Sequence, residues 1–310
     1  FLQVVYSEVP LVLLLLLLLP MLACVKKPEE IIAPTMGALN LLADESIRSI
    51  VEQEEEIFER FYPYAHLDIS YAAENDIFRQ LLEDSTDVIV TTRPLSAEEL
   101  KYLGQRQSVP KQFPFATGAI AFITNMASAD TAWTYEDLIG RMQNNSSGYR
   151  FVIENVKSGI AQEVLRFINS DSLPAHFYAL PNKQEVLAYV KQHEKTIGLI
   201  DYSDISDTDT QYTKEVLSSI QLMGITRPQD SIQYGFVRPF QYNLQDHKYP
   251  FTRDMYIITN TGMNDVSLGF ASFVCGEIGQ KIVLKAGLLP KFQTERNIEI
   301  SPTADIKVVK

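Results

Sequence analysis

The stretch Asp87-Val88-Ile89-Val90-Thr91-Thr92-Arg93 decides the fold, because a short apolar run ends there in polar residues. An apolar run of this length between turn-forming residues is typical of a buried parallel strand. Polar residues that directly follow such a strand lie at its carboxyl end, where open α/β sheets bind their ligands. We therefore expect residues 88–90 to form an interior strand and residues 91–93 to face a binding site.

Strands and helices alternate on both sides of this stretch. Strand-type runs and helix-type periodicity follow one another from residue 39 to residue 123, which predicts a parallel sheet covered by helices. The other expected strands are Leu39–Ala43, His66–Tyr71 and Gly118–Ile123, and the expected helices are Ile47–Tyr62, Ile77–Leu82 and Ala97–Leu103. The order βαβαβ places the chain in the α/β class.

The middle of the chain repeats this alternation with its own elements, so we expect a second lobe. The expected elements are strands Phe151–Ile153 and Ile197–Ile200, helices Ala161–Ile168 and Lys183–Gln192, a polar turn-rich region Asp204–Lys214 and a further strand over Val216–Met223. An extended strand over Tyr249–Ile258 and a helix over Gly269–Ala286 are expected to follow.

The beginning of the chain predicts export and a lipid anchor. The apolar run Leu11–Leu19 is shorter than the roughly 20 residues that span a membrane, but it suits the centre of a signal peptide. Met21-Leu22-Ala23-Cys24 resembles a bacterial lipobox, in which the cysteine is acylated and begins the mature protein. We expect a signal peptide over 1–23, a tether over 24–37, and attachment through Cys24 to the periplasmic or outer-surface side of a bacterial membrane. A buried core helix is the alternative.

Composition excludes several classes of protein. The chain is 46% hydrophobic, which is enough for a large core, and its net charge is −12 with no concentration of Lys and Arg. Nucleic acid and anionic membrane surfaces are therefore not expected partners. Cys275 has no intramolecular partner once Cys24 is acylated, so we expect no disulfide and no zinc site built on cysteine. We also expect no other metal, no cofactor and a monomer.

The sequence offers no pattern of an enzyme. His66, His176, His193 and His247 are scattered without the spacing of metal ligands, and we expect each at the surface. The acidic run Glu52–Glu56 lies on an expected helix and lacks the loop geometry of a calcium site, so it predicts a solvated helix face. Trp133 and the aromatic-rich segment 113–122 are expected in the core rather than in a sugar platform.

Several segments together resemble the phosphate-type solute-binding proteins of ABC transporters. They are Asp87–Arg93, Ser158-Gly159, Ile197–Tyr202, Tyr249–Arg253 and the closing stretch from Phe270 through Gly279-Gln280-Lys281-Ile282 to Pro290. The resemblance implies the type II periplasmic binding protein fold, with two α/β lobes joined by two crossing strands and closing over a ligand. It implies lobe 1 over 38–116 plus 250–310, and lobe 2 over 117–249.

Four segments are placed for an anion cleft, since each follows a strand and precedes a helix or a turn. Helix N-termini present free N–H groups and a partial positive charge, which favour oxyanions. The candidate ligand-binding residues are Ser46, Glu74, Asn75, Thr91, Thr92, Arg93, Ser158 and Gly159. Ser46 and Ser158 are equally suited to be helix N-caps. Arg93 is suited to bind an oxyanion bidentately, or else to form a surface ion pair with Glu98 or Glu99.

The chain departs from the pattern that the resemblance implies at three positions. Glu74 stands where the family has a serine, Glu154 where it often has an arginine, and Ile160 where it has a threonine. A carboxylate disfavours a fully ionised oxyanion but accepts a proton from hydrogen phosphate. The predicted function is capture of a small oxyanion, phosphate first, for an ABC permease. The alternative is a lipid-anchored sensor or surface adaptor that has the same fold without phosphate transport.

Overall fold

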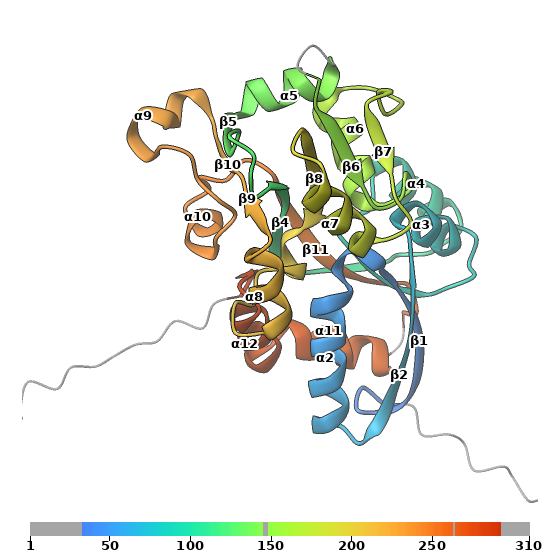
Figure 1. Cartoon of the computed structure of the whole chain (residues 1–310). Helices are drawn as coiled ribbons and strands as arrows, with labels where there is room; N and C mark the ends of the chain where they lie inside the picture. The colour runs from blue at the N-terminus through green and yellow to red at the C-terminus, as the bar shows by residue number, and fades with distance from the viewer. Residues whose placement is uncertain (1–32, 145–147, 263, 293–310) are drawn as a thin grey trace, which may run out of the picture. The chain divides into compact units, whose positions relative to one another are not determined.

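The computed structural model describes residues 33–144, 148–262 and 264–292 (Figure 1). The predicted signal peptide, Cys24 and most of the tether lie outside these residues. The described residues belong to one compact unit. Within the described part, no single helix has the length and apolar composition of a membrane span. Helices Val266–Cys275 and Glu277–Lys285 meet that criterion only as a pair, which is bent by 58°.

A ten-stranded mixed sheet runs through the unit in the order β2-β1-β3-β11-β4-β8-β6-β7, with β12 and β9 also paired to β4. The strands are β1 Met36–Asp44, β2 Tyr64–Ala72, β3 Val88–Thr91, β4 Lys111–Asn125, β6 Arg150–Ile153, β7 Phe177–Ala179, β8 Thr196–Asp201, β9 Ile220–Leu222, β11 Thr252–Thr259 and β12 Leu289–Pro290. A separate pair joins β5 Ala132–Thr134 and β10 Gly224–Thr226. Pairing is parallel in β2-β1-β3 and in β8-β6-β7, as the alternation predicts.

The two long strands at the centre, β4 and β11, break this pattern because they run antiparallel to their neighbours. The first part of β4 pairs with β11 and its later part with β8, so one strand serves both halves of the sheet. A bulge between Met255 and Tyr256 skips Phe115 next to Pro114, where proline has no N–H to donate. The predicted lobe boundaries, near 116 and 250, fall where β4 and β11 lie close together, and they stay a prediction.

Helices cover the sheet. They are α2 Arg48–Phe61, α3 Glu74–Leu82, α4 Ala97–Gln105, α5 Tyr135–Gln143, α6 Gly159–Ile168, α7 Lys183–Gln192, α8 Gln211–Leu217, α9 Ser231–Tyr234, α10 Gln241–Gln245, α11 Val266–Cys275 and α12 Glu277–Lys285. Single turns of 3₁₀ helix span Glu45–Ile47, Tyr202–Asp204 and Pro228–Asp230. Most of the predicted elements are present, although many of them begin or end a few residues away from the predicted positions, and α7 has the predicted bounds.

Two predicted elements are wrong in part. The helix expected over 269–286 is two helices that meet at Gly276, where an added Cβ would lie 2.9 Å from the Ser272 carbonyl oxygen. The strand expected over 216–223 is present only as β9, because Val216 and Leu217 belong to the end of α8. Thr210, in the region expected to be polar and turn-rich, is the N-cap of α8. The cap hydroxyl bonds the Thr213 N–H and so lets a helix start in a stretch without apolar periodicity.

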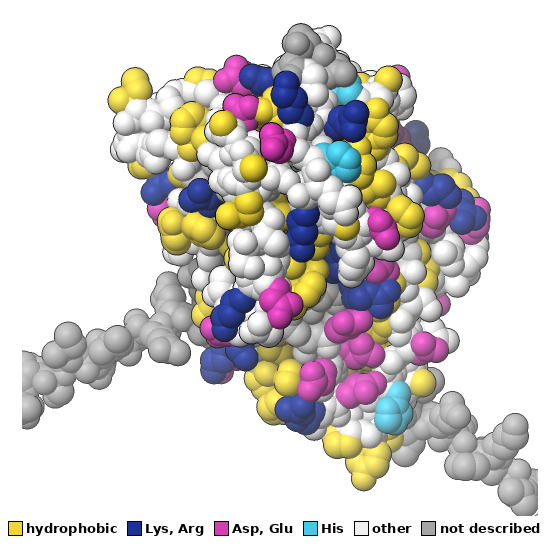
Figure 2. Space-filling view, viewed as in Figure 1, with side chains coloured by type: hydrophobic (Ala, Val, Ile, Leu, Met, Phe, Trp, Pro, Cys, Tyr) yellow, Lys and Arg dark blue, Asp and Glu magenta, His cyan; other side chains and the backbone are white. Residues whose placement is uncertain are grey.

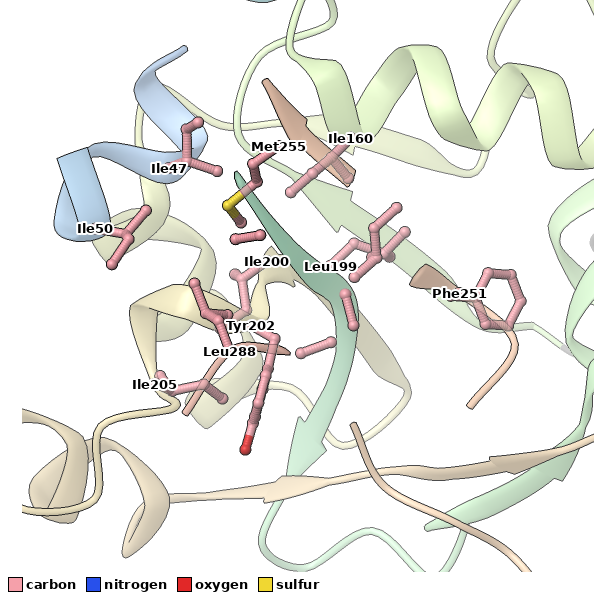
Figure 3. Close-up of a cluster of buried hydrophobic side chains, with 14 of the residues drawn as sticks. Ile47, Ile50, Ile160, Leu199, Ile200, Tyr202, Ile205, Phe251, Met255 and Leu288 are labelled. Atoms are coloured by element: carbon pink, nitrogen blue, oxygen red, sulfur yellow. The ribbon is translucent and has the colours of Figure 1, made fainter. Parts of the chain in front are cut away.

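The core packs around β4. Figure 3 shows side chains from the first turn of α2, from α6, β8 and β11 gathered about this strand, among them Ile50, Ile160, Leu199 and Met255. Trp133 is buried, as predicted. His176 is buried too, which contradicts its expected surface position. Its ring nitrogen Nε2 forms a hydrogen bond with the carbonyl oxygen of Arg141, so this buried polar atom has a partner.

The acidic run on α2 is solvated only in part. Figure 2 shows acidic side chains gathered where Figure 1 draws α2, and Glu52 and Glu56 are exposed there. Glu54 is 1% exposed, which contradicts the prediction of a solvated face. It lies four residues from both Ile50 and Phe58, so it falls on the apolar stripe of the helix.

Candidate functional site

The carboxyl ends of β1 and β3 and the N-termini of α3 and α6 meet at one point. Gly159, the first residue of α6, marks it: an added Cβ would lie 2.9 Å from Asp44 Oδ2 and 2.9 Å from Glu74 Oε2, and against the guanidinium of Arg253. Asp44 ends β1 and Glu74 begins α3. The parallel order of β1 and β3 brings these ends together, as the sequence predicts.

Five buried polar residues fill this point, and we call Asp44, Glu74, Thr92, Asp201 and Arg253 the Arg253 cluster. Arg253 Nη1 donates to Asp201 Oδ2 at 2.9 Å, and Nη2 bonds the Thr92 hydroxyl and lies 3.7 Å from Asp44 Oδ2. Thr92 Oγ1 donates to Glu74 Oε2 at 2.9 Å. All five side chains are at most 2% exposed. Two buried atoms of the cluster, Glu74 Oε1 and Arg253 Nε, have no hydrogen-bond partner among the described residues.

The cluster holds three carboxyl groups against one guanidinium. Burial raises the pKa of Asp44 to about 6, with Arg253 opposing the rise and Glu74 adding to it. Burial also raises the pKa of Asp201, again opposed by Arg253. The carboxylates outweigh the burial of Arg253 and raise its pKa. Ionisation of Asp44 and Asp201 is therefore resisted in the cluster, and added negative charge is disfavoured there.

Arg93 lies at the edge of this cluster and is already engaged. Its Nη1 and Nη2 each donate to Glu99 at 2.8 Å, and its guanidinium stacks 3.4 Å from the Phe78 ring centroid. Its Nε lies 3.5 Å from Glu74 Oε1. Glu99 also closes the capping box of α4 with Ser96, which fixes its position. The structure thus contains the predicted alternative, an ion pair with Glu99, together with a contact to Glu74.

The other predicted residues take different roles. Ser158 caps α6, since its hydroxyl accepts from Ala161 N–H. Ser46 does not cap a helix: Asp44 accepts its N–H, and its own buried hydroxyl has no hydrogen-bond partner among the described residues. Thr91 Oγ1 is likewise buried without such a partner in the described part of the chain. Asn75 lies in the first turn of α3 and lines a cavity.

Two cavities open beside the cluster. One of about 930 Å³ is lined by polar side chains that include Asn75, Arg93, Gln162 and Arg166. The other, of about 460 Å³, is lined by residues that follow β1, β2, β6 and β7, and we call it the Glu154 cavity. Its charged lining residues are Asp44, Glu45, Arg48, Glu154 and Lys183. No group of three or more His, Cys, Asp or Glu residues suited to a metal ion occurs among the described residues.

Sequence reasoning missed Arg253 and Asp201 as site residues. Arg253 lies in a predicted strand, at a buried position that alternates with Thr252 and Asp254. That alternation places it on the same side as Met255, which is a core residue. A charged residue on the core face of a strand is a signal for a buried ion pair.

Comparisons with known proteins give a family and a fold. Residues 28–277 match the model of the PBP superfamily domain. A comparison with curated protein sequences found no match. A Clostridium perfringens structure with bound phosphate, assigned as a phosphate ABC transporter substrate-binding protein, is 17% identical with a TM-score of 0.67; the match covers 82% of this chain and 99% of that chain.

Two further solved structures share the fold. An ABC-type phosphate transport receptor from Vibrio cholerae is 14% identical with a TM-score of 0.63, over 82% of this chain and 100% of that chain. The reduced OxyR regulatory domain from Pseudomonas aeruginosa is 11% identical with a TM-score of 0.51, over 78% and 98%. At these identities the likeness shows the fold alone, and it confirms the predicted α/β periplasmic-binding-protein fold.

Proposed function

The chain belongs to the PBP superfamily, and from this membership we propose that it is a lipid-anchored solute-binding protein that captures a small oxyanion, phosphate first, for an ABC permease. The observation that carries the proposal is the meeting of Glu74, Thr92 and Gly159 at the ends of β3, α3 and α6. Solved structures of the same fold are described as phosphate-binding transport proteins, and one of them holds phosphate.

A protonated oxyanion suits this point better than a fully ionised one. Glu74 and Asp44 are acceptors, and they repel an anion that has no proton to donate. Phosphate keeps a proton near neutral pH, whereas sulfate does not. Arg93 supplies the donor, because its guanidinium lies beside Glu74 and can exchange its bonds to Glu99 for bonds to the ligand.

Calorimetry with phosphate and sulfate tests the ligand. We expect phosphate to bind and sulfate not to bind, and Arg93→Ala to weaken phosphate binding by about ten- to a hundredfold, as for loss of one charge-assisted bond. Glu74→Gln should narrow the gap between the anions, because an amide donates as well as accepts. Arg60→Ala is the matched control, since Arg60 is exposed on α2. Equal affinity for both anions would remove Glu74 from the site.

The anchor and the lobes belong to the same proposal. Cys24→Ser should leave the precursor unlipidated and move it out of the membrane fraction, and unchanged lipid labelling would contradict the anchor. We also propose that the lobes, 38–116 with 250–310 and 117–249, close over the ligand. Small-angle scattering should then give a smaller radius with saturating phosphate, whereas an unchanged radius despite measured binding would contradict closure.

A second function is favoured by the contents of the Arg253 cluster. Arg253 and three carboxyl groups occupy the place where an oxyanion would lie, and the cluster already disfavours added negative charge. The fold does not require transport, because the OxyR regulatory domain has it as well. A lipid-anchored sensor or surface adaptor without phosphate transport accounts for this cluster. In the titrations above, no heat with either anion would select this function.

A further inference from the structure

The segment between β10 and β11 carries an exposed aromatic surface. Four large hydrophobic side chains with exposed fractions from 42% to 98% fall within residues 232–242, namely Ile232, Tyr234, Phe236 and Tyr242. Figure 2 shows hydrophobic side chains next to Lys and Arg side chains where Figure 1 draws α9 and α10. Exposed apolar side chains that gather in one place mark binding sites, whereas isolated ones are ordinary. This segment therefore has the character of a ligand-binding surface.

The three aromatic side chains of this surface line one cavity of about 300 Å³, which we call the Tyr242 cavity. Its other lining residues are Val237, Arg238, Phe240, Asn243 and Lys248. The volume lies at the lower end of the range for small-molecule sites and suits a ligand that contains a single ring. Apolar walls with a few polar groups among them are the usual composition of such sites.

Hydrogen bonds of buried residues hold the walls of the Tyr242 cavity in place. Asn243 is buried, and its Nδ2 donates to the Arg238 carbonyl oxygen at 2.9 Å. The carbonyl oxygen of Asn243 in turn accepts from the Lys248 N–H at 2.9 Å. Val237 is buried as well and pairs with Ile225 in an antiparallel bridge. The cavity is thus pre-formed, so a ligand has little of this segment to order when it binds.

The lining of the Tyr242 cavity is positively charged. It contains Arg238 and Lys248 and, among the described lining residues, no acidic side chain, in a chain whose net charge is −12. Lys248 is engaged, because its Nζ lies 2.7 Å from Asp246 Oδ2 and 4.5 Å from the centroid of the Tyr234 ring. Arg238 Nε donates to the Leu222 carbonyl oxygen at 2.9 Å, and no described carboxylate forms an ion pair with this arginine. The bond at Nε orients the guanidinium and leaves its two terminal nitrogens available to an anion.

We propose that the Tyr242 cavity binds a small aromatic carboxylate. The ring of the ligand packs against the three exposed aromatic side chains, and its carboxylate accepts two N–H bonds from Arg238. An inorganic oxyanion is the weaker match, because it leaves the aromatic walls exposed to water. A neutral aromatic molecule leaves the guanidinium without an anion. This inference does not rest on the oxyanion proposal, which concerns the carboxyl ends of β1 and β3.

The test is calorimetry on the purified protein with sodium phenylacetate as the probe. Phenylacetamide has the same shape without the charge, and acetate has the charge without the ring. We expect saturable binding of phenylacetate, and binding weaker by about tenfold or more for each control ligand. Arg238→Gln should weaken phenylacetate binding by about ten- to a hundredfold, as for loss of a charge-assisted bond. Arg227→Gln is the matched control, because Arg227 bonds the His247 carbonyl oxygen and does not line the cavity.

Tyr242→Ala tests the aromatic wall and should weaken phenylacetate binding by about three- to tenfold, as for loss of one aromatic contact. Tyr64→Ala is its control, since Tyr64 is exposed at the start of β2. Arg238→Lys keeps the charge and guards against a misfolded glutamine variant, so it should retain more affinity than Arg238→Gln. Absence of phenylacetate binding by the wild-type protein would overturn the inference. Equal affinity for phenylacetate and phenylacetamide, or unchanged affinity in Arg238→Gln, would also overturn it.

Titration of phosphate in parallel separates the two proposals. Arg238→Gln should leave phosphate affinity unchanged, and saturating phosphate should leave phenylacetate affinity unchanged. Displacement of phenylacetate by phosphate would place the carboxylate at the strand ends and overturn this inference. Phosphate binding without phenylacetate binding removes this inference and leaves the oxyanion site, and the reverse result does the opposite. A dimer in sedimentation analysis that Tyr242→Ala dissociates, without phenylacetate binding, would instead assign the surface to a second copy of this chain.

Discussion

The Arg253 cluster and Glu54 show two ways in which this protein buries carboxyl groups. In the cluster, Asp44, Glu74 and Asp201 surround one guanidinium. On α2, both oxygens of Glu54 are buried without a hydrogen-bond partner in the described part of the chain, and burial alone raises its pKa to about 9. The first site is balanced chiefly by a cation and the second by a proton. The carboxyl groups at the strand ends are thus paired with a cation, whereas the surroundings of the buried carboxyl group on α2 disfavour its charged form.

The largest effect should come from removing the cation of the cluster. Arg253→Met leaves three buried carboxyl groups without their counter-ion, and we expect the free energy of unfolding to fall by about 3 to 5 kcal/mol, as when one partner of a buried pair is removed. Urea unfolding measures this loss. Arg60→Met is the matched control, because its pair with Glu56 is exposed and is worth at most about 1 kcal/mol. A loss for Arg253→Met no larger than this control would contradict the role of Arg253.

Glu54 should behave in the opposite way, so that Glu54→Gln stabilises the protein. Its folded pKa lies above the unfolded value of 4.5, so the wild-type fold is not penalised below about pH 4.5. Between that pH and the folded pKa of about 9, the unfolded chain ionises first and wild-type stability falls by up to roughly 1.4 kcal/mol per pH unit. Between pH 4.5 and pH 8 this amounts to at most about 5 kcal/mol, and burial of the glutamine amide without a partner costs part of it. We therefore expect Glu54→Gln to be more stable by about 2 kcal/mol or more at pH 8 and by little at pH 4.5.

Chemical denaturation across this pH range measures the difference. Glu56→Gln serves as the control, because Glu56 lies two residues away on the exposed side of α2. It should shift the stability by only a few tenths of a kcal/mol, as for an exposed helix pair. A Glu54→Gln gain that does not grow with pH would show that Glu54 is ionised in the folded protein, which would remove the contrast with the cluster.

Gly159→Ala tests how closely the cluster is packed. The new Cβ would lie 2.9 Å from Asp44 Oδ2 and from Glu74 Oε2, which requires the carboxylates or α6 to move. We expect a loss of about 1 to 3 kcal/mol, as for overpacking of a core. Gly140→Ala is the control: Gly140 lies in α5 with nothing within 4 Å of an added Cβ, so alanine should stabilise the helix by about 0.5 to 1 kcal/mol. Equal changes in stability for Gly159→Ala and Gly140→Ala would show that the cluster rearranges around the added methyl group at little cost.

The sequence predicts the meeting of strand ends and helix N-termini, because apolar runs and helix periodicity are local signals. Val88–Thr91 is buried along its whole length, and Gly159 begins a helix behind the cap Ser158, as these signals indicate. The pairing of Arg253 with Asp201 is different. The two residues are 52 positions apart, and only the antiparallel arrangement of β11, β4 and β8 brings them together. No local pattern contains that information.

At Glu54 the residue composition and the helix spacing give opposite predictions of burial. Five acidic or amide residues over 52–56 suggest a solvated face, yet the spacing of Ile50, Glu54 and Phe58 places Glu54 on the apolar stripe. Phe58 in turn packs edge-on against Phe270 and Phe273 of α11, which buries this stripe. Helix periodicity is therefore a better guide to burial here than residue type.

The smallest effect separates the two aspartates that flank Arg253. Asp201 lies 2.9 Å from Nη1 and also accepts from the N–H and hydroxyl of Ser203, whereas Asp44 lies 3.7 Å from Nη2 and also accepts from the N–H of Ser46. We expect Asp201→Asn to cost about 1 kcal/mol more than Asp44→Asn, because it removes the stronger set of bonds to an ionised group. Urea unfolding of both variants at pH 7 measures the difference.

The pH dependence of Asp44→Asn sharpens this comparison. Burial holds the folded pKa of Asp44 at about 6, above its usual 3.8, so ionisation is resisted in the fold. Between about pH 4 and pH 6 the wild-type protein should lose stability relative to Asp44→Asn, since the unfolded aspartate ionises first. A relative stability that instead rises over this range would show that Asp44 is a fully ionised partner of Arg253. Arg253 alone would then balance the ionised carboxyl groups, and the repulsion that disfavours a further anion would be stronger still.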